Sequence, residues 1–200
     1  MRITANYHTH SRYDDGQGEL ADYVLAALRK GFSHLGFSGH APLPFPTSWN
    51  MPEQDFSGYQ AAVLELKERY AGRIEILHGL EVDFLPGLMS PAQARAKFGR
   101  LDYCIGSIHF LGELQDGQRW TVDGPPAQFA RGLRETFGGD IRRLVEAYYR
   151  RLSEMLSSGV PDIIGHFDLV KKNNRGGVFF SEEEPWYRRA VSDALFAVKA

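Results

Sequence analysis

The sequence lacks the features that mark secreted, membrane-spanning and nucleic-acid-binding proteins. Its 200 residues include one cysteine, Cys104, so no disulfide can form within the chain, and this predicts a protein of the reducing cytoplasm. The formal net charge is only -2, which gives no reason to expect a nucleic acid as a partner. No run of about 18 apolar residues occurs, and residues 1–6 contain no apolar signal core, so we expect no membrane segment.

The composition is that of an ordinary globular protein. Hydrophobic residues make up 43% of the chain, charged residues 24% and aromatic residues 12%. This balance excludes a disordered, collagen-like or coiled-coil chain. Because no internal repeat or linker is visible, the length predicts a single domain over residues 1–200.

Short apolar runs alternate with amphipathic stretches, a pattern typical of β/α units around a largely parallel sheet. We expect strands at 2–7, 34–38, 73–84, 103–109 and 162–166, helices at 20–30, 59–70, 91–98, 141–156 and after residue 184, and loops at 41–55 and 112–126. Gly31 is predicted to end the first helix and Asp140 to cap the fourth. Ser181 and Glu184 have the spacing of a capping box before the last helix.

Histidine or carboxylate side chains follow five of the predicted strands, at the point where each strand ends. They are His8 and His10, His40, Glu81, His109 and His166. In parallel β/α folds, ligands and catalytic groups collect at the carboxyl ends of the strands. Imidazole suits transition metals, and a carboxylate can join two ions. The five strand ends together therefore predict a site for more than one metal ion.

Each residue by itself has an ordinary alternative. A single histidine is more often a structural or surface residue than a ligand, and the glycines before His40 and His166 also mark common turns. Glu81 lies in an apolar run, where a buried carboxylate needs a partner, either an ion or a basic side chain. Asp15 belongs to a sequence that also suits a plain turn, but its nearness to the first two histidines makes it a candidate oxygen ligand.

Three other residues are expected to be structural. His34 and His78 lie at the start of a strand or inside one, away from the strand ends. Cys104 stands within an apolar strand, which indicates a small buried hydrophobe more than a nucleophile.

The ordered motifs resemble those of the polymerase and histidinol phosphatase (PHP) superfamily of metal-dependent phosphoesterases, and more narrowly its histidinol-phosphate phosphatases. The segments that carry the resemblance are 8–10 (HTH), 36–44 (GFSGHAPLP), 79–83 (GLEVD), 105–112 (IGSIHFLG) and 164–168 (IGHFD). The similarity runs from Tyr7 to nearly the end of the chain. It implies a TIM-like distorted (β/α)7 barrel with up to three divalent ions, Zn, Fe or Mn, at the carboxyl ends of the strands.

The resemblance also implies a ligand assignment. His8 and His10 would hold the first ion, and Glu81 would bridge it to a second ion completed by His109 and His166. The third ion would take Asp15 and His40. The family pattern ends in an Asp-x-His motif that this sequence lacks, since the only late aspartate, Asp193, is followed by Ala194 and Leu195. We therefore expect the barrel to lack its last strands in this chain.

The expected activity is hydrolysis of a small phosphate monoester, with L-histidinol phosphate as substrate and histidine biosynthesis as the pathway. A hydroxide bridging the metal ions would attack phosphorus, with Glu81, His109 and His166 at the catalytic centre. Arg12, Lys171 and Lys172 lie near predicted ligands and are candidates for phosphate contact, although a solvated basic pair explains them equally well. Two alternatives remain: a phosphoesterase for another small ester, and an inactive truncated remnant.

Overall fold

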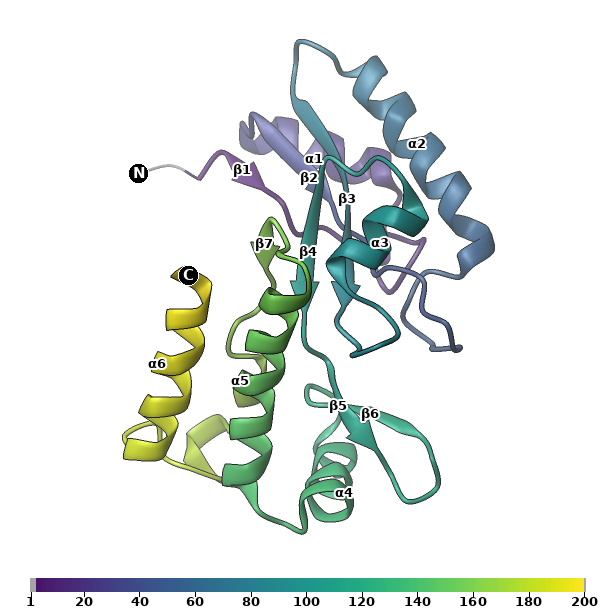
Figure 1. The fold of residues 1–200 in the computed structure, drawn as a ribbon. Coiled ribbons are helices and arrows are strands. Elements are labelled where there is room, and N and C mark those ends of the chain that lie inside the picture. Colours follow the sequence, from purple (N-terminus) through teal and green to yellow (C-terminus); the bar gives the residue numbers. More distant parts are fainter. Residues whose placement is uncertain (1–2, 200) are drawn as a thin grey trace.

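The computed structural model describes residues 3–199 and contains a curved sheet of five parallel strands in the order β1-β2-β3-β4-β7 (Figure 1). The strands are β1 (Ala5–Asn6), β2 (His34–Phe37), β3 (Glu75–Asp83), β4 (Tyr103–Ser107) and β7 (Ile163–Ile164), and β5 (Phe110–Glu113) pairs with β6 (Arg119–Thr121) in a separate antiparallel hairpin. The helices are α1 (Leu20–Lys30), α2 (Phe56–Arg69), α3 (Pro91–Phe98), α4 (Pro126–Phe137), α5 (Ile141–Ser158) and α6 (Pro185–Lys199). The predicted α/β class and parallel sheet are confirmed, and the sheet curls into part of a barrel.

Strand β3 runs through the middle of this sheet and shows how it is packed. Successive side chains of a strand point to opposite faces. Ile76, Leu80 and Val82 face outward and join a hydrophobic core with α2, whose Tyr59 and Val63 are fully buried. The alternate positions of β3 therefore face the concave side of the sheet, and this side carries Glu81.

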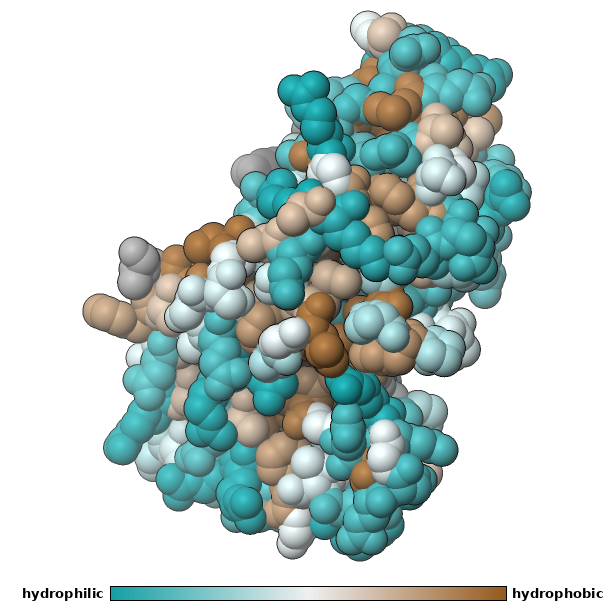
Figure 2. All heavy atoms as spheres, turned by 45° about the vertical axis from the view of Figure 1, so that its right-hand side comes forward, coloured by the Kyte–Doolittle hydropathy of each residue, from teal (hydrophilic) through white to brown (hydrophobic). Residues whose placement is uncertain are grey.

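A second core lies beyond the carboxyl ends of β3 and β4. It is built by the hairpin, α4, α5 and α6, which form the lower half of the molecule in Figure 1. The arrowheads of β3 and β4 point toward this half, so the ends of these strands lie between the two cores. In the face shown in Figure 2, hydrophilic residues predominate and the hydrophobic ones form small separate groups, which is ordinary for a protein surface.

The predicted loop at 112–126 is wrong in part, because this region contains most of the hairpin and leads into α4, which the sequence analysis did not predict. Trp120 of β6 is fully buried and packs on Phe129 and Phe137 of α4. Its ring lies so close to Gly132 that a Cβ there would come within 2.3 Å of it. The hairpin is thus held by a tertiary contact with a helix. Its strands are only three and four residues long, too short for an alternation of apolar and polar residues to predict them.

The ends of several elements differ from those predicted. Gly31 ends α1 with a left-handed φ of 74°, and the Asp140 side chain accepts a hydrogen bond from the Arg143 N–H, both as expected. The capping box is wrong: α6 begins at Pro185, and the Ser181 hydroxyl accepts from the N–H of Glu183. Strands β1, β4 and β7 are shorter than predicted, and residue 2 lies outside the described residues. Between residues 3 and 199, no helix is both long and apolar enough to cross a membrane.

Candidate metal centre

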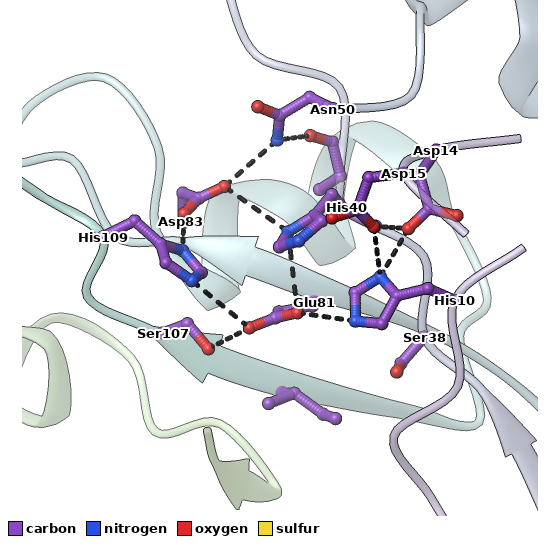
Figure 3. A network of polar contacts seen from close by, with 12 residues as sticks. His10, Asp14, Asp15, Ser38, His40, Asn50, Glu81, Asp83, Ser107 and His109 are labelled. Carbon is purple, nitrogen blue, oxygen red and sulfur yellow. Dashed lines mark hydrogen bonds and ion pairs between the residues drawn. The ribbon is translucent and has the colours of Figure 1, made fainter. Parts of the chain in front are cut away.

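The side chain of Glu81 is 1% exposed and lies at the centre of five histidine rings. Its two oxygens divide these rings between them. Oε2 lies 2.8 Å from Nε2 of His8 and 3.2 Å from Nε2 of His10. Oε1 lies 2.8 Å from Nε2 of His166 and 3.9 Å from Nε2 of His109. Figure 3 shows Glu81 between His10, His40 and His109. One carboxylate therefore connects two pairs of histidines.

The structure brings together all seven metal ligands that the sequence predicts. Their donor atoms fall into groups in which every atom lies within 4.8 Å of the others: His8, His10 and Glu81; Glu81, His109 and His166; His10, Asp15 and His40. The first two groups correspond to the predicted first and second ions, and the third adds His10 to the predicted pair of Asp15 and His40. A fourth group consists of His40, Asp83 and His109.

Backbone geometry around β4 and β7 helps to bring His166 into this cluster. Gly165 lies where a Cβ would come within 2.1 Å of Ser107 Oγ, so only glycine permits this approach. The next residue, His166, has a φ of 21°, which is unusual for a residue with a side chain. Ser107 in turn donates a hydrogen bond of 2.5 Å to Oε1 of Glu81.

The electrostatics of the cluster are those of a crowded group of imidazoles around buried carboxylates. Burial alone would raise the pKa of Glu81, but hydrogen bonds from His10, His166 and His8 hold it well below its usual value. Burial also opposes the charged form of His10, yet its bonds to Asp14 and Glu81 raise its pKa to about 10. For His40 burial prevails, and its pKa is lowered.

The donor set fits metal ions better than it fits a purely hydrogen-bonded cluster. A carboxylate offers about four lone-pair sites, and Glu81 already uses three of them for His8, His166 and Ser107. The Nδ1 atom of His40, which lies 3.5 Å from Oε2 of Glu81, is buried without a hydrogen-bond partner. Buried polar atoms normally have partners. Nitrogen and carboxylate donors at this spacing suit Zn and similar ions.

Two aspartates that the sequence analysis missed hold the histidines in place. Asp83 accepts a hydrogen bond from Nδ1 of His109, and Asp14 accepts one of 2.5 Å from Nδ1 of His10. Both aspartate side chains are fully buried. Carboxylates that bind the far nitrogen of a ligating histidine fix its tautomer and its orientation. Asp83 could have been found, because it lies two residues after Glu81 on one strand and so faces the same side.

Beside this cluster lies a cavity of ≈ 640 Å³. His40, His109 and Asp15 form its metal-centre end, and Trp49 stands over the cluster with its ring 4.5 Å from that of His40. The predicted loop at 41–55 and the segment 120–123 both contribute to the lining. Trp120 itself does not, because it is buried in the second core.

The three predicted phosphate contacts lie outside this lining. Arg12 pairs with Glu19 at 2.6 Å, and Lys171 pairs with Asp168 and Glu182. Lys172 reaches the cavity only through Asp123, with which it forms an ion pair of 3.1 Å.

The residues expected to be structural lie away from the cluster. His34 pairs with Glu75, and His78 packs against Phe56 and Tyr59. Cys104 is fully buried, and this burial raises the pKa of its thiol to about 12, which leaves no reactive thiolate at neutral pH.

A curled parallel sheet with a cluster of histidines and carboxylates at its strand ends defines a class of metal-binding β/α protein. The sequence model of the PHP domain family matches residues 6–198, and the chain belongs to this family. Its relatives include a protein of Deinococcus radiodurans named probable histidinol-phosphatase, 34% identical over 157 residues, which are 78% of this chain and 56% of that protein. The histidinol-phosphatase of Bacillus subtilis is 32% identical over 166 residues, 76% of this chain and 60% of the relative. The chain thus spans less than two thirds of both.

Solved structures support the fold. A candidate histidinol phosphatase of Listeria monocytogenes superposes with a TM-score of 0.82 at 23% identity, over 98% of this chain and 78% of that one. The histidinol phosphate phosphatase of Lactococcus lactis, complexed with Zn, L-histidinol and phosphate, superposes with a TM-score of 0.58 at 16% identity, over 96% of this chain and 70% of that one.

Proposed function

We propose that this protein is a metal-dependent phosphomonoesterase that hydrolyses L-histidinol phosphate to L-histidinol and phosphate, a step of histidine biosynthesis. The observation that carries the proposal is the division of four histidines between the two oxygens of Glu81. A carboxylate so placed joins two adjacent cation sites, and adjacent cations are the usual means of binding and cleaving a phosphate ester. The names of the relatives favour histidinol phosphate as the ester.

The proposed ligand roles follow the geometric groups. His8 and His10 would hold one ion together with Glu81, and His109 and His166 would hold a second with the same carboxylate. Asp15 and His40 would hold a third. The expected ions are Zn, Fe or Mn, which when bound stabilise the phosphoryl oxygens and acidify a water molecule. Asp14 and Asp83 keep the imidazoles of His10 and His109 oriented toward the ions.

The remaining residues shape the surroundings of the ester. The rings of Trp49 and Phe110 stack 5.7 Å apart beside His109 and form an aromatic wall on this side of the cluster. Cys104 is buried, so the chain's one thiol is unsuited to attack phosphorus, and no covalent phosphoenzyme is expected. The same unpaired thiol supports the proposal that the protein is cytoplasmic.

Phosphate release tests this function. The purified chain is loaded separately with Zn²⁺, Mn²⁺ or Fe²⁺ and given L-histidinol phosphate or glucose phosphate, with a chelator-treated sample as control. We expect metal-dependent release that is fastest with L-histidinol phosphate. Equal turnover of both esters would contradict L-histidinol phosphate as the preferred substrate and would indicate a phosphomonoesterase for small esters in general. A metal-replete chain that releases no phosphate from either ester would overturn the activity.

A further inference from the structure

The wall of the cavity beside the metal centre also includes the hairpin and the start of α4. Phe45, Trp49 and Phe110 line this part of the wall, and so do Thr121 and Asp123. Asp123 stays near the metal centre, because the N–H of the preceding residue, Val122, donates to the carbonyl of His109 at 2.9 Å. Among residues 3–199, the carboxylates that line the cavity are those of Asp15 and Asp123. Since Asp15 belongs to the metal centre, Asp123 is the acidic group left for the rest of a bound molecule.

Asp123 is held in position by the chain on both sides of it. The side-chain amide of Asn173 donates to the carbonyl of Val122 at 3.2 Å and to the carbonyl of Gly124 at 3.0 Å. These two hydrogen bonds fix the backbone on both sides of Asp123. Its side chain is 24% exposed, which leaves the carboxylate accessible from the cavity it lines. A fixed and partly desolvated carboxylate is a good acceptor for a charged donor.

Arg119 and Lys172 are cations near Asp123, and both leave its carboxylate able to accept a hydrogen bond from a bound ammonium group. Arg119 also lines the cavity, but its guanidinium pairs with Glu113 at 2.9 Å and lies 4.6 Å from the centre of the Phe45 ring. Lys172 contacts Asp123 with an ammonium group on a side chain that is 53% exposed. An exposed ion pair of this kind contributes little free energy, so a ligand ammonium can displace the lysine.

We propose that Asp123 is a specificity-determining residue that binds the ammonium group of the substrate. This inference rests on the proposed function and deepens it: the phosphate ester lies at the metal centre, the amine two carbons from the ester oxygen lies at the nearby Asp123, and the rest of the alcohol portion lies along the aromatic wall. The chemical class selected is a phosphate monoester of an amino alcohol. L-histidinol phosphate belongs to this class, and its imidazole ring suits the wall formed by Trp49 and Phe110.

The test compares two esters that differ only in the amine, L-histidinol phosphate and imidazolylpropyl phosphate. In Asp123→Asn we expect KM for L-histidinol phosphate to rise about tenfold or more, because one charge-assisted hydrogen bond to the substrate is lost. We expect kcat to change little. KM for the ester without the amine should stay the same. The matched control is Asp116→Asn, which changes another carboxylate of the same hairpin that pairs with Arg131 and does not line the cavity.

Lys172→Gln separates this inference from direct phosphate binding by the lysine. If Lys172 competes for Asp123, its removal lowers KM for the amino ester alone; if it contacts phosphate, KM rises for both esters, which contradicts the inference. Calorimetric binding of L-histidinol and of imidazolylpropanol to the metal-loaded chain tests the amine without turnover. Equal affinities for the two alcohols in the unaltered protein would overturn the role of Asp123. A chain that discriminates between the alcohols but cleaves neither ester would contradict only the proposed function.

Discussion

Glu81 and Asp83 contact opposite nitrogens of one imidazole: Oε1 of Glu81 lies 3.9 Å from Nε2 of His109, and Asp83 accepts the hydrogen bond of its Nδ1. The two carboxylates lie two residues apart on β3 and so share its concave side. They differ in what else they contact. Glu81 is shared by five histidines, while Asp83 also accepts a bond of 3.1 Å from Asn50. One therefore suits the metal ions, and the other suits the orientation of a ligand.

Glu81→Ala is expected to remove more than one metal ion per chain and to abolish turnover. The reason is that Glu81 contributes to two separate groups of donors. The metal content of the purified variant, measured by plasma mass spectrometry, checks this. His34→Ala is the matched control, because its ring pairs with Glu75 outside the cluster and its loss should leave metal content unchanged. Full metal and full rate in Glu81→Ala would refute the ligand assignment.

Asp83→Asn is expected to weaken metal binding by about 10- to 100-fold, which is the usual cost of losing the carboxylate behind a ligating histidine. The amide has nearly the same shape, so the fold should persist. Competition with a chelator of known affinity measures the change. Glu75→Gln alters an exposed carboxylate on the same strand and serves as control. An unchanged affinity in Asp83→Asn would mean that His109 needs no such support.

The positions of the site residues could be predicted because their chemistry coincides with strand ends. Parallel strands bring their carboxyl ends to one edge, so His8, His40 and Glu81 meet although they are far apart in the chain. The same argument applied along β3 points to Asp83. Asp14 is different, because its contact with His10 depends on the course of an irregular loop that no periodicity describes.

The second core was harder to predict from the sequence. Helix α4 buries Phe129, Leu133 and Phe137 at helical spacing, but it follows Pro125, begins at Pro126, and the hairpin before it has strands of only three and four residues. Its position is fixed by the packing of Trp120 on Gly132, a contact that exists only after folding. The positions of the Arg12 and Lys171 side chains could not be predicted for the same reason. Each pairs with a carboxylate, Glu19 or Glu182, that comes close to it only in the folded chain.

Gly79→Ala is expected to destabilise the protein by about 1–3 kcal/mol, the usual cost of overpacking. The added Cβ would lie 2.5 Å from the ring of Tyr103, which covers Gly79 and Gly36 on the concave side and donates to the carbonyl of Tyr7. Urea unfolding measures the loss. In a Tyr103→Ala background the same glycine substitution should cost much less. An equal cost in both backgrounds would show that the ring is not the obstacle.

His78→Phe is expected to make the protein less sensitive to acid. Burial holds the pKa of His78 below 6.5, against a hydrogen bond that the imidazole donates to the backbone of Arg100 and against the charge of Asp102, while Lys67 lowers the pKa further. Below pH 6.5 the unfolded chain therefore binds a proton that the folded chain does not, and the free energy of unfolding falls as the pH falls toward the folded pKa. The ring lies between Phe56 and Tyr59, so phenylalanine fits its surroundings. Urea unfolding at pH 7.5 and 5.5 should show a smaller decrease for His78→Phe than for the unaltered protein. The same decrease in both would mean that acid acts elsewhere in the fold.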